Sequence, residues 1–579
     1  MKNIIKKINK FDETIQIQEF EKRINILSSV KNVNEISKII KESGFNHIEC
    51  VSGTDFPDSG EIEVAYFVGS TNDKLKDKVI SLTSRVSRDK PKFPTLTEIW
   101  AGSEFHERET WEMLGVEFQN HPGLDKLLLP DDWKDIPPLR KDYHNKKWGD
   151  SERERVGLDV KRGSPRGKIE EEVIPNEFDI EEIRNPKFIQ EFLDTAAASD
   201  ADILGGQLQQ SVKTNEKTMA ISFGVQHPGS GHMRLVLGID GDIITSCEPD
   251  IGYVHRGEEK MCEYKNYFQN IPHLERPVIH DSCGILFPYV LGVEDLLEIT
   301  DKIPDRAKYI RIIMAELNRI ISHMYWLGIM GIFTGHSTMF MWAMGDREMI
   351  IEAASKLGGA RVTFAYFTPG GVRNDTPPGF EEYMLKICDK FEERLNQYNN
   401  IFFQNSLFKQ RTQGVGILSD NDAINWGAVG PALRGSNVNS DVRKDDPYGN
   451  YELIDFDVPV MKEGDSYARS MVSYLEMYES IKIIRNAIKL MKPGPVKVPM
   501  RGAIRMKEGE TYVRTEAAHG AMSYYIISKA KPEPYRVRIS VPSFRNLLPL
   551  VKQLLPGQHV SDVPVIHWSL NYWAVEGDR

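Results

Sequence analysis

The spacing of hydrophobic residues predicts an N-terminal unit that mixes helices and strands. Residues 33–43 place apolar side chains at helical intervals, and residues 61–68 (EIEVAYFV) alternate apolar and polar positions as a strand does. A second, β-rich stretch begins near Thr218 with the pattern MAISFGV, and MRLVLGIDGDIITS predicts two further strands. These two strands meet at Asp240-Gly241, a dipeptide typical of tight hairpin turns.

The strongest helix pattern runs over residues 305–327. Its apolar positions follow the spacing of one helix face: Ile310, Ile313, Leu317, Ile320, Ile321 and Met324. Another face carries Glu316, Arg319 and His323 on neighbouring turns, which indicates either a solvated or internally paired polar stripe or a buried functional one. Further helices are expected at residues 346–356, 379–399 and 467–491.

Residues 144–172 are dense in charge, glycine and proline, so they can bury little apolar surface and are predicted to form a linker. We expect a domain at 1–145, a linker at 146–215 and a larger domain at 216–579. The predicted fold class is α+β, with a small N-terminal α+β domain followed by a domain that begins β-rich and has a helical core.

Charge argues against nucleic acid as a partner. The 579 residues include 73 Lys+Arg and 84 Asp+Glu, a net charge of −11, and the basic residues are interspersed with acids. The five cysteines form no CxxC pair and no Cys/His ligand spacing, so we expect neither a disulfide framework nor a metal bound by the chain.

No targeting or membrane-spanning segment is expected. The N-terminus alternates charged and apolar residues and lacks the apolar core of a secretory signal. The most apolar stretch, residues 324–344, contains serine, threonine, histidine and several glycines, which is too polar for a spanning helix.

One motif stands out chemically, the segment QHPGSGHMRL. His227 and His232 flank a glycine-rich hairpin tip, where the missing side chains let a flat ligand approach the backbone and an imidazole together. The alternative is a plain turn with capping histidines. A second segment, GYVHRGEEK, is a charged run between apolar segments, which a salt-bridged helix start also explains.

Motifs in a fixed order then indicate a known family. QHPGSGHMRLVL, GYVHRGEEK, YFQNIPHLER, AELNRIISHMYWLG, PGGV, LRGS, DVRKDDPY, FDVP and the terminal GDR resemble the 49-kDa-type subunit of respiratory complex I, a relative of the nickel–iron hydrogenase large subunit. Upstream, FPTLTEIWAGSEFHERETWEMLGVEF, HPGLDKLLLPDDW and PPLRKDY resemble its 30-kDa-type subunit. The chain is therefore similar to the 30-kDa (C-type) and 49-kDa (D-type) subunits of complex I fused in one polypeptide.

The resemblance implies a position beside a neighbouring subunit that carries the terminal iron–sulfur cluster, with a quinone entering between the two from the membrane. His232 falls where the family has its quinone-headgroup histidine, although this loop is one residue shorter, and His227 and Gly231 belong to the same quinone-binding loop. Arg276 keeps the arginine expected beside the cluster, where a fixed cation favours the reduced state.

Departures from the family pattern affect the expected proton donors. The family's donating tyrosine aligns with Ile279, and the aspartate that pairs with the headgroup histidine aligns with Phe333. Quinone reduction consumes two protons, so another titratable group must supply them. We therefore predict His232, His280 and Asp281 as catalytic residues and place Ile279 in the quinone-binding set by alignment.

The resemblance also bears on metals. The two CxxC pairs that hold nickel and iron in hydrogenases would fall at Val278 and Asp281 and at Trp573 and Glu576, and none of the four is cysteine. We expect no nickel–iron centre and no metal ligands on this chain.

Other polar residues have simpler explanations. Arg434, Asp441 and Arg443 are expected to stabilise an irregular loop by ion pairing, and His323 to be a hydrogen-bonded core histidine. Cys283 is interpreted as a lone buried thiol. A set in the N-terminal unit is expected to serve docking to other subunits: Glu107, Arg108 and Trp111.

The leading hypothesis is a subunit of a proton-translocating, complex I-like NADH-quinone oxidoreductase, held peripherally at the cytoplasmic face of the cell membrane by its partners. Those partners are the iron–sulfur subunit, other peripheral-arm subunits and a membrane-arm subunit at the quinone entrance. One alternative is the large subunit of an energy-converting-hydrogenase-related complex without nickel and with a non-quinone acceptor, and another is a non-catalytic scaffold. The sequence has no dinucleotide-binding glycine motif, so the electron donor depends on other subunits.

Overall fold

A computed structural model describes most of the chain. The described residues are 2–13, 15–20, 22–130, 133–143, 219–225, 232–499 and 506–579. The predicted linker, residues 146–215, lies outside them. The fold is a mixture of helices and sheets, which confirms the α+β fold class.

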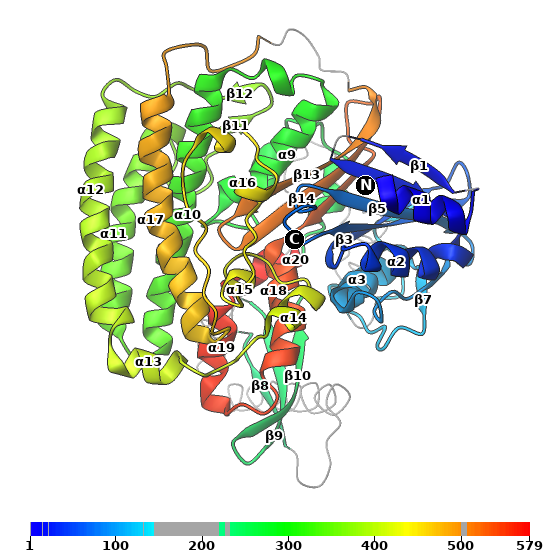
Figure 1. Ribbon diagram of the computed structural model, residues 1–579, viewed down its shortest axis with the longest axis horizontal. Coiled ribbons are helices and arrows are strands. Elements are labelled where there is room, and N and C mark those ends of the chain that lie inside the picture. The colour runs from blue at the N-terminus through cyan, green and yellow to red at the C-terminus, as the bar shows by residue number, and fades with distance from the viewer. Residues whose placement is uncertain are drawn as a thin grey trace, which may run out of the picture.

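The N-terminal unit is built on a five-stranded sheet in the spatial order β1-β2-β5-β4-β3 (blue in Figure 1). β2 and β5 run parallel and the other neighbours antiparallel. The strands are β1 (Gln16–Glu19), β2 (Arg23–Leu27), β3 (His47–Phe56), β4 (Glu61–Gly69) and β5 (Val79–Ser87). The helices of this unit are α1 (Lys2–Phe11), α2 (Val33–Glu42) and α3 (Glu104–Leu114), and a short parallel pair is β6 (Lys92–Pro94) and β7 (Glu117–Gln119). The predicted helix at 33–43 and strand at 61–68 are thus confirmed.

Both faces of this sheet are buried. Along β4, Val64 and Tyr66 point into the main core, whereas the alternate residues Ala65 and Phe67 belong to a second apolar cluster. Phe67 stacks on Tyr512 with ring centroids 4.4 Å apart, and Tyr512 belongs to a different sheet far along the chain. The strand therefore joins the two units of the chain instead of facing solvent.

A second sheet, in the order β10-β9-β8, opens the larger unit. Its strands are β8 (Met219–Phe223), β9 (Arg234–Asp240) and β10 (Ile243–Asp250), followed by the short helices α7 (Glu258–Cys262) and α8 (Asn270–Leu274). β9 and β10 pair across the turn at Asp240-Gly241, where Gly241 has φ +63°. The predicted hairpin is thus confirmed. Glycine suits this turn because the turn needs a residue that tolerates positive φ.

Four long helices form the core of the larger unit, side by side on the left in Figure 1. They are α10 (Asp305–Phe333), α11 (Ser337–Gly358), α12 (Phe380–Tyr398) and α17 (Ser466–Leu490). Each corresponds to one of the predicted helices. The bounds of α12 and α17 agree with the prediction to within one residue, whereas α10 and α11 extend well beyond the predicted ends. The helix α9 (Ser282–Leu296) packs on a third sheet, made of β13 (Glu508–Ala517), β14 (Gly520–Lys529) and β15 (Arg536–Ser540). In the described residues, no helix is both long enough and apolar enough to cross a membrane.

Shorter elements connect this frame. They are β11 (Phe367–Thr368), β12 (Gly371–Val372), α13 (Ser406–Thr412), α14 (Asp420–Asn425), α15 (Gly430–Arg434), α16 (Val442–Asp445), α18 (Pro542–Leu554), α19 (Val563–Ser569) and α20 (Ala574–Asp578). The chain ends inside the molecule, because the C-terminal Arg579 is only 2% exposed.

Ion pairs join the two units. Glu109 of α3 accepts hydrogen bonds from both terminal nitrogens of Arg538 on β15, at 2.8 and 2.7 Å, and pairs with Arg579 at the C-terminus. Arg538 also contacts Glu259 of α7 at 3.1 Å. All four side chains are buried, so the N-terminal unit is fixed to the larger one by charges that water does not screen.

The docking role expected for the α3 residues is wrong in part. Glu107 is fully buried and its carboxylate accepts hydrogen bonds from Tyr66, from the Leu96 amide and from Ser103. Arg108 is buried too and pairs with Glu248 of β10 at 3.1 Å. Both side chains face inward from helix α3 and bond to other parts of this chain. They therefore offer no surface to a partner subunit.

Candidate functional site

The segment that follows α8 contains four of the predicted site residues, and they divide into two pairs. Arg276 and Ile279 are exposed, Ile279 by 49% of its surface, whereas His280 and Asp281 are buried. The segment therefore lies at the surface of the molecule, with Arg276 and Ile279 turned outward and His280 and Asp281 turned inward.

His280 is enclosed by three rings. Its ring centroid lies 4.7 Å from that of Trp573, 5.2 Å from that of Tyr325 and 5.2 Å from that of His519. The Nδ1 atom of His280 and the Nε1 atom of Trp573 are buried without a hydrogen-bond partner among the described residues. Burial, helped by the charge on His519, lowers the pKa of His280 well below its ordinary value, so the ring is neutral at physiological pH.

Asp281 is fully engaged by the backbone. One carboxylate oxygen caps helix α9 by accepting from the Gly284 amide at 3.2 Å, and the other accepts from the Ala518 amide at 2.7 Å. Such a carboxylate fixes α9 against the turn between β13 and β14. Its geometry is that of a structural cap, and the predicted role of Asp281 as a proton donor gains no support from it.

His519 is a candidate site residue that the sequence reasoning missed. It lies with Ala518 in the two-residue turn between β13 and β14 and is 1% exposed. Its Nδ1 atom is 2.9 Å from Oε2 of Glu576, and its Nε2 atom is 3.2 Å from the hydroxyl of Ser322. Burial disfavours the charged ring, but the carboxylate of Glu576 outweighs it, and the pKa of His519 is raised.

The four positions that align with the hydrogenase cysteines do converge in space. His280, between Val278 and Asp281, packs on Trp573, and Glu576 meets His519 beside the amide bound by Asp281. A valine, a tryptophan and two carboxylates stand at the positions that align with the soft thiolates. In the described part of the chain, no group of three or more His, Cys, Asp or Glu side chains is arranged to hold a metal.

His232 lies just before β9, and the residue after it contacts the same region. It is exposed and has φ 69°, and its neighbour Met233 is buried. The hydroxyl of Tyr572 donates to the sulfur of Met233 at 3.6 Å, and Tyr572 directly precedes Trp573, which packs on His280. The segments of His232 and His280 thus meet the same C-terminal stretch. The other two predicted loop residues, His227 and Gly231, lie outside the described residues.

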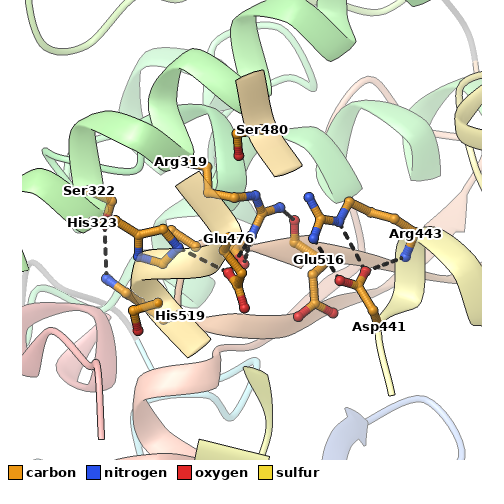
Figure 2. Close-up of polar contacts among 12 residues, drawn as sticks. Arg319, Ser322, His323, Asp441, Arg443, Glu476, Ser480, Glu516 and His519 are labelled. Carbon is orange, nitrogen blue, oxygen red and sulfur yellow. Dashed lines mark hydrogen bonds and ion pairs between the residues drawn. The ribbon is translucent and has the colours of Figure 1, made fainter. Parts of the chain in front are cut away.

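A buried ion cluster begins directly behind His519 (Figure 2). Ser322, the partner of His519, precedes His323 on α10, and His323 lies 3.0 Å from Glu476 of α17. His323 also accepts from the Asn571 amide at 3.3 Å if its Nδ1 atom is unprotonated. The expectation of a hydrogen-bonded core histidine is confirmed.

The cluster continues through alternating charges. Arg434 lies 2.6 Å from Glu476 and 2.8 Å from Glu516, and Arg443 lies 3.0 Å from Glu316 and 2.6 Å from Asp441. Arg319 pairs with Glu316 at 3.2 Å and donates to the Ala517 and Glu516 carbonyls at 2.7 Å. The polar stripe of α10 is therefore buried and internally paired. The ion pairing expected of the 434–443 loop is confirmed, but it reaches α10, α17 and β13 and not just the loop.

This cluster contains four carboxylates and three guanidinium groups: Glu316, Asp441, Glu476 and Glu516 against Arg319, Arg434 and Arg443. Burial raises the pKa of Glu516, whereas Arg434 and His323 overcome burial at Glu476 and lower its pKa. A proton on Glu516 removes the excess negative charge.

Two known families match different parts of the chain. Residues 26–148 match the respiratory-chain NADH dehydrogenase 30 Kd subunit family, and residues 334–504 and 498–579 match the 49 Kd subunit family. Together with the fold, these matches define a protein that joins the 30-kDa and 49-kDa types in one chain.

Curated relatives specify the family. The D subunit of NADH-quinone oxidoreductase from Geobacter sulfurreducens is 38% identical over 388 residues, which cover 62% of this chain and 98% of the relative. The C/D subunit of NADH-quinone oxidoreductase from Acinetobacter baumannii is 31% identical over 512 residues, which cover 84% of this chain and 80% of the relative. The chain belongs to the C/D-type subunit family of NADH-quinone oxidoreductase, and the resemblance noted from its motifs is confirmed.

A solved structure is similar as well. A chain of the membrane-bound sulfane sulfur reductase, an archaeal respiratory membrane complex, superposes with a TM-score of 0.61 at 31% sequence identity. The superposition covers 64% of this chain and all of that chain.

Proposed function

We propose that this chain and a partner subunit that carries the terminal iron–sulfur cluster form the site at which electrons pass to a membrane quinone. The observation that carries the proposal is the meeting of the His232 and His280 segments at Tyr572 and Trp573. Met233, which follows His232, contacts Tyr572, and His280 contacts the next residue, Trp573, which supports a common site for the two histidines. A quinone needs two electrons and two protons there, and imidazoles are suited to deliver protons near neutral pH.

His232 is the donor nearest solvent in this proposal. It is exposed just before the start of β9, so it can reach a quinone headgroup and be reprotonated from water. Neutral His280 accepts or donates a hydrogen bond through its free Nδ1 atom, depending on its tautomer. The aromatic rings of Tyr325 and Trp573 limit the access of water to His280.

The partner subunit is proposed to cover the surface around Arg276. The segment that carries Arg276 and Ile279 is tied to residues 362–365, since Ser282 donates to the Val362 carbonyl at 3.0 Å and Glu275 accepts from the Ala365 amide. Large apolar side chains are exposed here, in the segment before α7 and in the connection between α7 and α8: Tyr253, Tyr264, Phe268, Ile279 and Val362. Exposed aromatic side chains beside arginines are typical of protein interfaces.

The assembled enzyme is proposed to be a proton-translocating NADH-quinone oxidoreductase. Other peripheral-arm subunits supply the electrons, and a membrane-arm subunit at the quinone entrance holds the chain at the cytoplasmic face of the cell membrane.

A second acceptor is favoured by two observations. Ile279 stands where the family's donating tyrosine is expected and is half exposed, and the similar solved structure comes from a sulfane sulfur reductase. In this alternative the chain is the large subunit of an energy-converting-hydrogenase-related complex without nickel, and a sulfane sulfur compound takes the electrons.

The test uses the intact complex, purified through a tag on this chain, with its clusters reduced chemically beforehand. Addition of a ubiquinone or menaquinone analogue should reoxidise the clusters, and His232→Ala should slow this at least about tenfold. His559→Ala is the matched control, because His559 is also an exposed histidine but pairs with Asp242 on the far end of the β9–β10 hairpin.

Each result decides between the alternatives. If the wild-type complex reoxidises with polysulfide but not with quinone, the quinone proposal is wrong and the second acceptor is supported. If quinone works and His232→Ala is as fast as wild type, His232 has no role in catalysis and a scaffold function for this segment follows.

A further inference from the structure

The environment of His519 differs from that of every other ring beside His280. Trp573 and Tyr325 offer no charge at neutral pH, whereas His519 forms a 2.9 Å pair with Glu576. Ser543 also donates a hydrogen bond to that carboxylate, and the Trp573 amide donates to the Ser543 hydroxyl at 2.8 Å. Glu576 is therefore fixed in one position, and through it the His519 ring is fixed beside His280.

His519 is sealed from solvent but not isolated. Titratable and charged groups face it from each packed element: Glu576 of α20, His280 and Asp281 before α9, and Arg319 and His323 of α10. Two of these are carboxylates at short range, and Arg319 is already paired with Glu316. The balance favours the protonated ring, in agreement with the raised pKa of His519.

Backbone contacts hold the turn of His519 in place. The Ala518 amide donates to Asp281, and the carbonyl of His519 accepts from the side-chain amide of Asn546 at 3.2 Å. Gly430 approaches the same turn so closely that a Cβ atom there would lie 2.4 Å from the His519 carbonyl oxygen. These contacts come from residues far away in the sequence, so the tertiary structure fixes the position of His519.

We propose that the His519–Glu576 pair stores the proton that accompanies electron transfer at this site and delivers it through His280. This inference rests on the proposed function for the existence of an acceptor, but it holds for a quinone or a sulfane sulfur compound, because both take up protons when reduced. His519 is a positioning and proton-storing residue, since His280 lies between it and the acceptor.

The proton and electron balance for a quinone is complete. Two electrons arrive one at a time through the iron–sulfur cluster of the partner, which is reduced again between the transfers, one proton comes from His232, and the second comes from His280. To give His280 that proton, the Nε2 atom of His519 must release its contact with Ser322, and neutral His519 keeps its Nδ1 hydrogen bond to the Glu576 carboxylate. Once the reduced acceptor has left, water returns a proton to His280, which passes it back to His519, and the cluster is left oxidised.

The first experiment compares the pH dependence of cluster reoxidation in wild type, His519→Gln and Glu576→Gln complexes, with whichever acceptor, quinone analogue or polysulfide, reoxidises the wild type. The wild-type rate should fall at high pH as His519 loses its proton. His519→Gln should be at least about tenfold slower at neutral pH and should lose this fall. Glu576→Gln should move the fall to lower pH, because the carboxylate no longer stabilises the charged ring.

The second experiment does not need an acceptor. Infrared difference spectra of the complex with ¹⁵N-labelled histidine, taken across the same pH range, should contain an imidazolium signal that His519→Gln removes and Glu576→Gln shifts to lower pH. His47→Gln is the matched control, because His47 is also buried but contacts Ala428 and Arg545. Cluster spectra of each variant establish that the complex has assembled.

Unchanged pH profiles in both variants would overturn the proposal, and so would an infrared titration that His519→Gln leaves intact. Failure of the proposed function is a separate result: the wild type would then reoxidise with polysulfide alone, and the same variants would still be compared with that acceptor.

Discussion

Glu109 offers a test of how the two units of this chain are held together. Its carboxylate accepts two hydrogen bonds from Arg538, at 2.8 and 2.7 Å, and one from Arg579, and all three residues are at most 4% exposed. Glu109→Gln keeps the shape and one carbonyl acceptor but removes the charge. A hydrogen bond to a charged group contributes about 1.5–3 kcal/mol. With the glutamine carbonyl in the place of Oε1, the bond at Oε2 is lost and the two at Oε1 lose the charge that strengthens them.

The estimate agrees with what is known of broken buried ion pairs, which cost about 3–5 kcal/mol when one partner is removed. Glu259 still contacts Arg538 at 3.1 Å, but it faces Arg536 as well and cannot neutralise three guanidinium groups. We therefore expect Glu109→Gln to lower the free energy of unfolding by about 3–5 kcal/mol at neutral pH.

Urea unfolding of the purified chain, followed by circular dichroism, measures this loss. The control is Glu35→Gln, because Glu35 pairs with Lys38 but its side chain is 55% exposed, and a loss of no more than about 0.5 kcal/mol is expected. Arg538 and Arg579 overcome the effect of burial and lower the pKa of Glu109, so its stabilisation is complete above the carboxyl's unfolded pKa and is lost as the pH falls through the folded one. The difference in the free energy of unfolding between wild type and Glu109→Gln must therefore become smaller at acidic pH. A loss below about 1 kcal/mol at neutral pH would refute the reasoning.

Three further substitutions test other features. Gly430→Ala, at φ +60° and with its Cβ 2.4 Å from the His519 carbonyl oxygen, should cost more than about 2 kcal/mol in urea unfolding, and a neutral result would contradict the tight approach. Burial raises the pKa of Glu107 to about 7 from 4.5, so the folded state binds the extra proton and wild-type stability should fall as the pH rises between these values. Glu107→Gln should remove this pH dependence of the free energy of unfolding. If the pH dependence is unchanged in the variant, it comes from a group other than Glu107. Asp441→Asn leaves Arg443 without the carboxylate that it meets at 2.6 Å and should cost about 3 kcal/mol by the same urea assay, whereas a loss under about 1 kcal/mol would mean that Glu316 alone suffices.

Local sequence signals predicted the individual elements well. The apolar spacing on α10 and the Asp240-Gly241 turn depend on residues close together in the chain, so the sequence alone located them. The predicted helices were shorter than α10, which continues to Phe333, and α11, which begins at Ser337. The glycines and polar residues of positions 324–344 are tolerated in these helices because both pack on neighbouring elements. Ordered motifs were also enough to identify the family, since each motif keeps its own sequence wherever the fold places it.

The partners of buried charges could not be predicted in this way. Glu107 and Arg108 cannot be told from surface residues when only their neighbours in sequence are considered, yet α3 turns both inward. The polar stripe of α10 was left open between solvent and interior, and residues of α17, β13 and the 434–443 loop decided the question by supplying opposite charges.

The candidate site shows the same division. The sequence by itself determined the fold class, the family and the absence of cysteine at the four hydrogenase positions, because these depend on residue type and order. Only the tertiary structure brought His519 and Glu576 beside His280, and it also assigned Asp281 to two backbone amides. His280 and His519 lie far apart in the chain, and a contact over that separation is set by how the sheet and helices pack, which no local pattern in the sequence records.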